Sequence, residues 1–171
     1  LLKKYYFIDK FDKSNIDKQQ RNTIIIYRNY KKNHKTHEIL SIKNHCKKKG
    51  LKFFLSNNIK LSIKLNLNGA YLPSFNRTYA HLNYKYKKDF LLIGSAHNLK
   101  EIRIKEKQKV QEIFLSSIFK KNSNFLGLNK FNLLSKLSKK KIIALGSVSK
   151  QNIKIIKLTK CIGIAGISYF K

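Results

Sequence analysis

Residues 140–171 read KKIIALGSVSKQNIKIIKLTKCIGIAGISYFK and contain two apolar runs, each leading into a small-residue turn. The first run, 141–145, precedes Gly146 and Ser147, and the second, 161–169, contains Gly166 and Ser168. Between them, 149–159 has the pattern of a short helix that begins at an N-cap, Ser149. Apolar β-branched runs are typical of parallel strands buried on both faces. The C-terminal stretch therefore predicts a strand, a turn, a helix and a second strand.

The same alternation continues through the rest of the chain. Further strands are predicted at 4–8, 23–28, 52–56, 69–72, 89–94 and 112–118, and further helices at 36–50, 57–68 and 128–141. Eight strands alternating with seven helices predict a compact α/β fold, the (β/α)8 TIM barrel, as a single domain over 1–171. A doubly wound open sheet is the alternative, and the regular crossovers favour closure. We expect trimmed terminal helices, because 171 residues is short for a barrel typically of about 250.

Composition excludes several classes of protein. Hydrophobic residues make up 42% of the chain, which argues against disorder. Cys46 and Cys161 have no metal-type spacing, so we expect buried thiols in a reducing compartment. No apolar run is long enough for a membrane span, so no membrane partner is expected. The opening LLKKYYFIDKFDK lacks the apolar core of a signal peptide, and we expect a cytoplasmic location.

A net charge of +30 raises the question of nucleic-acid binding. The lysines are spread along the whole chain, whereas nucleic-acid binders gather Lys and Arg on one face with aromatic residues between them. Lys also greatly outnumbers Arg, which favours general solvation over bidentate phosphate recognition. We expect only non-specific binding of nucleic acid at low salt.

Barrel active sites lie at the carboxyl ends of the strands, often with a phosphate site after strands 7 and 8. In that place the sequence has a glycine followed by a serine, directly or after one intervening residue. The residues are Gly146 and Ser147 after the first of these strands and Gly166, Ile167 and Ser168 after the second. Turn N–H groups and a Ser hydroxyl can bind an oxyanion closely where glycine leaves room. Glycines that only relieve crowding are the alternative. Their occurrence after both strands favours phosphate binding.

Polar residues also follow the other strands. Arg28 ends strand 2, Asn57 follows strand 3, and Ser95 and His97 lie in GSAHN at 94–98. His97 is a candidate general acid or base because imidazole titrates near neutral pH, and a structural hydrogen bond is the alternative. Lys120 and Lys121 could add charge for an anionic substrate, although solvation explains them equally well. The remaining histidines, expected on the surface, are His34, His37, His45 and His81.

Four segments together resemble the thiamine phosphate synthase / TenI family: FLLIGSAHNLKE, EIFLSSIF, IIALGSVSKQNI and GIAGISYF. The resemblance implies a TIM barrel in thiamine biosynthesis. Synthases of this family join hydroxymethylpyrimidine diphosphate to thiazole phosphate and release pyrophosphate. TenI-type relatives tautomerise the thiazole and use a histidine for proton transfer.

The resemblance also implies roles for residues. Ser147, Ile167 and Ser168 would hold the thiazole phosphate, Arg28 and Asn57 would hold the diphosphate, and Ser95 and His97 would line the site. Family synthases bind Mg²⁺ through carboxylates after strands 3 and 4. The resemblance therefore implies Mg²⁺ as a cofactor, but here those places read Asn57-Asn58 and Ser74-Phe75-Asn76, so the expected carboxylate ligands are absent and no metal-binding residue is predicted.

Three hypotheses follow from these observations. The first is a divergent transferase that makes thiamine phosphate, with lysines supplying part of the metal's charge. The second is a TenI-like thiazole tautomerase that relies on His97, and the third is a non-catalytic paralogue that binds thiazole phosphate. The partners are then small pyrimidine and thiazole phosphates, and the sequence leaves open whether the chain forms an oligomer.

Overall fold

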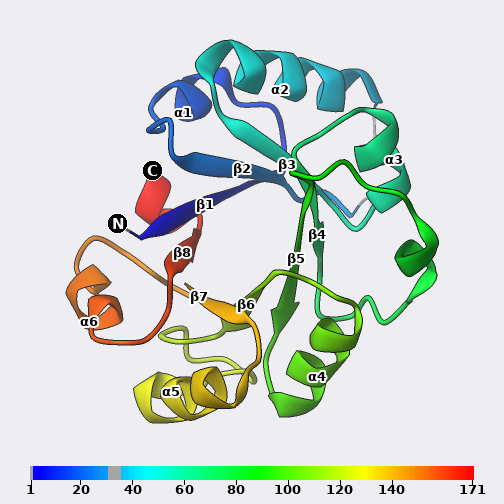
Figure 1. Cartoon of the computed structure of the whole chain (residues 1–171). Coiled ribbons are helices and arrows are strands. Elements are labelled where there is room, and N and C mark those ends of the chain that lie inside the picture. Colours follow the sequence, from blue (N-terminus) through cyan, green and yellow to red (C-terminus); the bar gives the residue numbers. More distant parts are fainter. Residues whose placement is uncertain (1, 31–35) are drawn as a thin grey trace.

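A computed structural model describes residues 2–30 and 36–171, which form a closed barrel of eight parallel strands (Figure 1). The strands follow one another around the barrel in chain order, and every neighbouring pair is parallel. Their bounds are β1 Lys3–Ile8, β2 Thr23–Tyr27, β3 Lys52–Ser56, β4 Gly69–Leu72, β5 Leu91–Ala96, β6 Glu112–Ser116, β7 Lys141–Leu145 and β8 Gly163–Gly166. The predicted barrel is confirmed, and the alternative of an open sheet is wrong.

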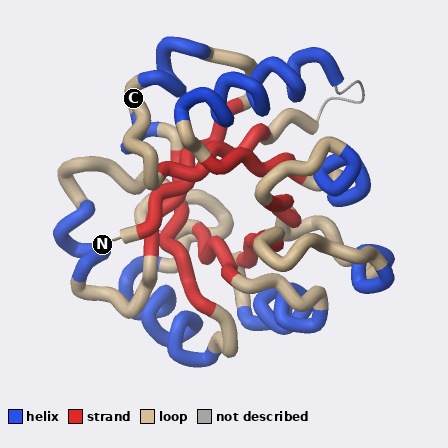
Figure 2. Tube along the Cα trace, turned by 45° about the horizontal axis from the view of Figure 1, so that its top comes forward, coloured by secondary structure: helices blue, strands red, loops and turns tan. Residues whose placement is uncertain are grey.

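Helices surround the strands on the outside of the barrel (Figure 2). The α-helices are α1 Lys13–Asp17, α2 Thr36–Lys49, α3 Ile59–Lys64, α4 Leu99–Lys107, α5 Gly127–Leu137 and α6 Ile153–Lys157. Two short 3₁₀ helices, η1 Ala80–Asn83 and η2 Ser168–Phe170, complete the described elements. In η2, the ring of Phe170 stacks on that of Tyr6 with the centroids 5.2 Å apart, which attaches this segment to β1.

Local patterns in the sequence did not locate every boundary. No helix was predicted at 13–17 or 99–107, where α1 and α4 lie. The last helix begins at Ile153 with Asn152 as its N-cap residue, so the prediction of Ser149 as the cap is wrong. The backbone N–H of Ser149 instead donates to Oδ1 of Asn152, 2.9 Å away, in the turn before the helix.

Three of the predicted surface histidines can be compared with the structure. His37 is exposed, and His45 is half-buried against Asp17, with 2.8 Å between its Nε2 and Oδ1 of the aspartate. His81 is buried, so its prediction as a surface residue is wrong. Its Nε2 lies 2.9 Å from the carbonyl oxygen of Gln108, because η1 packs against the end of α4. His34 lies outside the described residues.

Aromatic side chains fill the barrel interior. Tyr5, Phe7, Tyr71 and Phe114 meet there, and the Tyr5 and Phe114 ring centroids lie 5.0 Å apart in an edge-to-face arrangement. The Phe7 ring contacts both Tyr71 and Phe114, at 5.4 and 5.7 Å. Such pairs stabilise the fold beyond their buried area, by about 0.5–1.5 kcal/mol each. The interior is therefore a packed core rather than a channel.

A buried carboxylate closes the amino end of the barrel. Glu112, at the start of β6, accepts hydrogen bonds from the ammonium of Lys3 and the hydroxyl of Tyr5, both on β1. Both carboxylate oxygens of Glu112 are therefore bonded to side chains of β1, so these residues stabilise the amino end of the barrel. Ligand contacts are then expected at the carboxyl ends of the strands.

Two further expectations concern particular side chains and spans. Cys46 and Cys161 are both buried free thiols, as predicted. Burial raises the pKa of the Cys46 thiol to about 12, which keeps it protonated at neutral pH. Of the helices described, none combines the length and the apolar character that crossing a membrane requires.

Candidate active site at the carboxyl ends of the strands

Arg28 and Ile167 line the same small cavity, although they lie far apart in the sequence. The cavity has a volume of about 150 Å³ and is bounded by the ends of β1 and β2 and by the residues that follow β8. The guanidinium carbon of Arg28 lies 4.6 Å from the centroid of the Phe7 ring, which holds the charged group over the barrel core. The fold thus brings Arg28, predicted to bind the diphosphate, to the same cavity as Ile167, one of the residues predicted to bind the thiazole phosphate.

The turn after β7 is tightly built around Gly146. A Cβ on this residue would lie 2.3 Å from Oγ of Ser117, and its φ of +113° disfavours any side chain. The next residue, Ser147, also has a positive φ of 53° and is exposed. Its carbonyl accepts a hydrogen bond from Nδ2 of Asn152 at 2.9 Å, which ties the turn to the start of α6. The turn therefore presents the Ser147 hydroxyl on a fixed backbone.

The turn after β8 lies next to the turn after β7. Leu145 of β7 pairs with Ala165 of β8, so Gly146 and Gly166 are the following residues on two neighbouring strands. A Cβ on Gly166 would meet no atom within 4 Å, and both Ile167 and Ser168 are exposed. The space over Gly166 is open, as a backbone site for an oxyanion requires. The five residues predicted to bind phosphate therefore lie together on one part of the barrel end.

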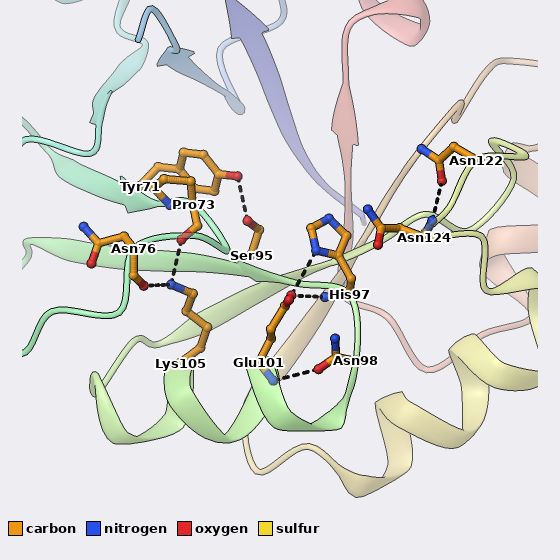
Figure 3. Close-up of polar contacts among 10 residues, drawn as sticks. All are labelled: Tyr71, Pro73, Asn76, Ser95, His97, Asn98, Glu101, Lys105, Asn122 and Asn124. Carbon is orange, nitrogen blue, oxygen red and sulfur yellow. Dashed lines mark hydrogen bonds and ion pairs between the residues drawn. The ribbon is translucent and has the colours of Figure 1, made fainter.

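The Ser95 side chain is buried near the carboxyl end of β5, where its hydroxyl takes part in a hydrogen bond. The Tyr71 hydroxyl on β4 donates to Oγ of Ser95 on β5 at 2.8 Å, and both side chains are buried (Figure 3). Burial raises the pKa of Tyr71 far above its ordinary value, so the phenol stays protonated. The pair gives this end of the core a fixed polar contact between two strands.

His97 is paired with a carboxylate directly after β5. Its Nδ1 lies 2.9 Å from Oε2 of Glu101, and its backbone N–H donates to the same oxygen at 2.8 Å (Figure 3). An ionised carboxylate only accepts hydrogen bonds, so Nδ1 carries the proton. In the neutral ring Nε2 is then the unprotonated nitrogen, which is the arrangement of a general base. His97 was predicted from the sequence, whereas its partner Glu101, four residues later on α4, was not.

The ends of β3 and β4 have amides where a metal site would need carboxylates. Nδ2 of Asn76 donates to Oδ1 of Asn57 at 2.7 Å, so the oxygen of Asn57 is already used. Across residues 2–30 and 36–171, no three His, Cys, Asp or Glu side chains gather closely enough to hold a metal ion. Mg²⁺ prefers charged oxygen ligands, and two mutually bonded neutral amides are poor ones. The donor set at the ends of β3 and β4 does not fit Mg²⁺.

Lys120 and Lys121 lie in the loop after β6 and are both exposed. Within the described part of the chain, neither ammonium pairs with a carboxylate. The Lys120 carbonyl accepts a hydrogen bond from Oγ of Ser117 at 3.0 Å, so the loop is attached to the turn that packs against Gly146. The two charges are therefore available to an anion near the β6 and β7 ends, without a fixed position.

Four further charged residues of the cavity were not predicted from the sequence. Asp9, Lys10, Asp12 and Lys171 line it together with Arg28. Asp9 directly follows β1, so the rule applied to the other strand ends would have found it. Lys171 follows η2, and only the attachment of that segment to β1 brings it to the cavity.

Solved structures with the same fold include a thiamine phosphate pyrophosphorylase and FabK. The thiamine phosphate pyrophosphorylase of Pyrococcus furiosus superimposes with a TM-score of 0.78 at 20% identity, covering 96% of this chain and 85% of that one. FabK from Thermotoga maritima superimposes with a TM-score of 0.76 at 8% identity, covering 99% of this chain and 59% of that one. At such identities the likeness shows the shared barrel fold alone.

Sequence comparison identifies the family. The thiamine-phosphate synthase of Methanococcus vannielii is 30% identical over 83 residues, which are 46% of this chain and 40% of that protein. The aligned part therefore spans less than half of that relative. Residues 17–170 match the family model described as thiamine monophosphate synthase. From the barrel, the strand-end turns and this match over most of its length, the chain belongs to the thiamine monophosphate synthase (TMP-TENI) family.

Proposed function

We propose that this protein is a transferase of the thiamine phosphate synthase type. It joins hydroxymethylpyrimidine diphosphate to thiazole phosphate. The observation that carries the proposal is the cavity shared by Arg28 and Ile167, because it puts a fixed cation beside the turn predicted to bind phosphate. Two anionic substrates that react with each other need adjacent sites at one barrel end.

The reaction needs little covalent help from the protein. The bond between the pyrimidine methylene carbon and the diphosphate oxygen breaks, and both electrons leave with the pyrophosphate. The thiazole nitrogen then donates its lone pair to the methylene carbon, which gives thiamine phosphate and pyrophosphate. Catalysis depends on stabilising the leaving anion and on aligning the two rings.

Residues of this chain can be assigned to each task. Arg28 stabilises the leaving diphosphate, with Asn57 as a neutral hydrogen-bond donor. Lys120 and Lys121 add positive charge from the loop after β6. Because the amides of Asn57 and Asn76 do not fit Mg²⁺, no step is assigned to a metal ion.

The thiazole phosphate is assigned to the neighbouring turns. Its phosphate oxygens accept from the hydroxyls of Ser147 and Ser168 and from backbone N–H groups near Gly166 and Ile167. The open space over Gly166 admits an oxyanion to the backbone. This arrangement directs the thiazole ring toward the cavity that Arg28 lines.

A second function is favoured by one specific contact. The pairing of His97 with Glu101 leaves Nε2 as a proton acceptor, which a thiazole tautomerase needs and a synthase does not. In that function the protein moves a proton on the thiazole ring of the bound phosphate, and it requires no pyrimidine substrate.

Product analysis separates the two functions. Purified protein is incubated with both substrates, with and without Mg²⁺, and thiamine phosphate and pyrophosphate are quantified. We expect the two products in equal amounts, with substantial turnover in the presence of a chelator. Conversion between thiazole tautomers without thiamine phosphate would replace the first function with the second. Absence of both reactions would contradict both.

A further inference from the structure

Lys105 of α4 is a fully buried lysine, with 0% of its surface exposed. Its alkyl chain passes directly beneath Gly94 of β5. A Cβ on Gly94 would lie 2.6 Å from Cδ of Lys105 and 3.0 Å from Cγ. Only glycine at position 94 leaves room for this side chain, which runs from α4 past β5 to the loop that follows β4.

The buried ammonium donates to three oxygens and to no carboxylate. Nζ of Lys105 lies 2.8 Å from the carbonyl oxygen of Pro73 and 2.8 Å from that of Asn76 (Figure 3). It also lies 2.9 Å from Oε1 of Gln108. All three of its protons are thereby used. Two of the acceptors lie in the loop that follows β4, so the ammonium holds that loop against α4.

Gln108, which follows α4 directly, strengthens the attachment. Its Nε2 donates to the carbonyls of Asn76, at 3.1 Å, and Thr78, at 2.8 Å. Its own carbonyl accepts from His81 of η1 at 2.9 Å. Gln108 is also fully buried. The end of α4 therefore holds segment 73–81 at four points, Pro73, Asn76, Thr78 and His81, through buried and partly buried hydrogen bonds.

The same hydrogen-bond network extends from Lys105 to Asn57, the residue proposed to contact the ligand. Asn76, whose carbonyl Lys105 binds, donates through Nδ2 to Asn57 at 2.7 Å. Asn57 has a positive φ of 58°, a left-handed conformation that asparagine adopts more readily than most residues. Asn57, Asn76, Thr78 and His81 line a second cavity of about 180 Å³.

We propose that Lys105 is the positioning residue of this side of the active site: through Asn76 it fixes the Asn57 side chain where a diphosphate is bound. The inference rests on the proposed function, in which Asn57 contacts the leaving pyrophosphate. Lys105 itself is covered and cannot touch the ligand. The side chain is costly to bury, since desolvation lowers the pKa of Lys105 to about 8. A hydrophobic residue would pack in its place without that cost, but it would remove one hydrogen bond from each of the Pro73 and Asn76 carbonyls and so weaken the attachment of the loop to α4.

Calorimetry with inorganic pyrophosphate and with thiazole phosphate tests the inference. Lys105→Met removes the ammonium and keeps most of the volume. We expect pyrophosphate to bind about tenfold more weakly, while thiazole phosphate, bound at the β7 and β8 turns, changes less than about twofold. Lys107→Met, an exposed position on the same helix, is the matched control and should change neither affinity.

A double-mutant cycle separates positioning from a general loss of stability. If Lys105 acts through Asn57, the effects of Lys105→Met and Asn57→Ala on pyrophosphate affinity are not additive, and the double variant resembles Asn57→Ala alone. Should Lys105→Met fail to fold, Gln108→Leu serves in its place, because it removes the bonds to Asn76 and Thr78 and keeps the lysine.

The outcomes distinguish this inference from the proposed function. Additive effects in the cycle, or an equal weakening of both ligands, would contradict the role of Lys105 and leave the proposed function intact. A wild-type protein that binds neither pyrophosphate nor thiazole phosphate would contradict both.

Discussion

The alkyl chain of Lys105 occupies the space that a side chain on Gly94 would fill, with 2.6 Å between its Cδ and the position of a Cβ. Gly94→Ala should therefore lower the free energy of unfolding by about 1–3 kcal/mol, because the buried lysine has to shift. Urea denaturation measures the change. Gly166→Ala is the control and should leave stability within about 0.5 kcal/mol, since its Cβ meets no atom within 4 Å. Equal stability of the two variants would contradict the close packing.

The stability of the wild type should depend on pH through Lys105. Burial lowers its pKa from the model-compound value of 10.5 to about 8 in the folded state. Between these two values the unfolded chain binds a proton that the folded chain does not, so the free energy of unfolding rises with pH. Relative to Lys105→Met, the rise from pH 8 to 10.5 should be about 3 kcal/mol. Urea denaturation of both proteins across this range checks it, and parallel pH profiles would contradict it.

Removal of the Arg28 charge should weaken binding of the leaving group. Arg28→Met keeps an alkyl chain over the Phe7 ring but loses the guanidinium. Pyrophosphate affinity should fall about 10- to 100-fold, the size expected for lost charge-assisted hydrogen bonds, while thermal stability changes little. Titration calorimetry gives the affinity. Arg21→Met, at an exposed position, should bind as the wild type does, and an unchanged affinity in Arg28→Met would remove Arg28 from the site.

Glu101→Gln should distinguish the two catalytic functions. A glutamine amide can donate to Nδ1 of His97, which lets the imidazole place its proton on Nε2 and lose its basic character there. Tautomerase activity should fall about 100-fold, whereas synthase activity should remain close to the wild-type value.

Glu106→Gln, on the same helix, is the control for Glu101→Gln, because Glu106 pairs with Arg103 rather than with a histidine. If thiamine phosphate formation collapses in Glu101→Gln and not in Glu106→Gln, the assignment of His97 to the tautomerase alone is wrong.

The barrel was predictable because its strands are short apolar runs, and because these runs alternate along the sequence with amphipathic, helix-like stretches. The turns at Gly146 and Gly166 were also predictable, since strand order alone makes β7 and β8 neighbours. The helix at 99–107 was not located, because its lysines and glutamates hide the two buried positions, Ile102 and Lys105.

Long-range contacts explain the other errors. Nothing near Lys105 in the sequence separates it from the solvated lysines around it, and its burial depends on acceptors more than 25 residues away, at Pro73 and Asn76. His81 is buried for the same reason, through the carbonyl of Gln108. Among the lysines of residues 2–30 and 36–171, only Lys105 is buried, and in a chain of net charge +30 nothing in the composition distinguishes it.

Titration calorimetry of thiazole phosphate tests the central claim, an anion site formed by the turns after β7 and β8. Wild type should bind one equivalent, and Ser168→Asp should abolish the heat, because a carboxylate at this exposed position repels the phosphate. Ser14→Asp adds the same charge at an exposed position on α1 and should bind normally. Binding that is equally tight in Ser168→Asp, or absent from the wild type, would contradict the account.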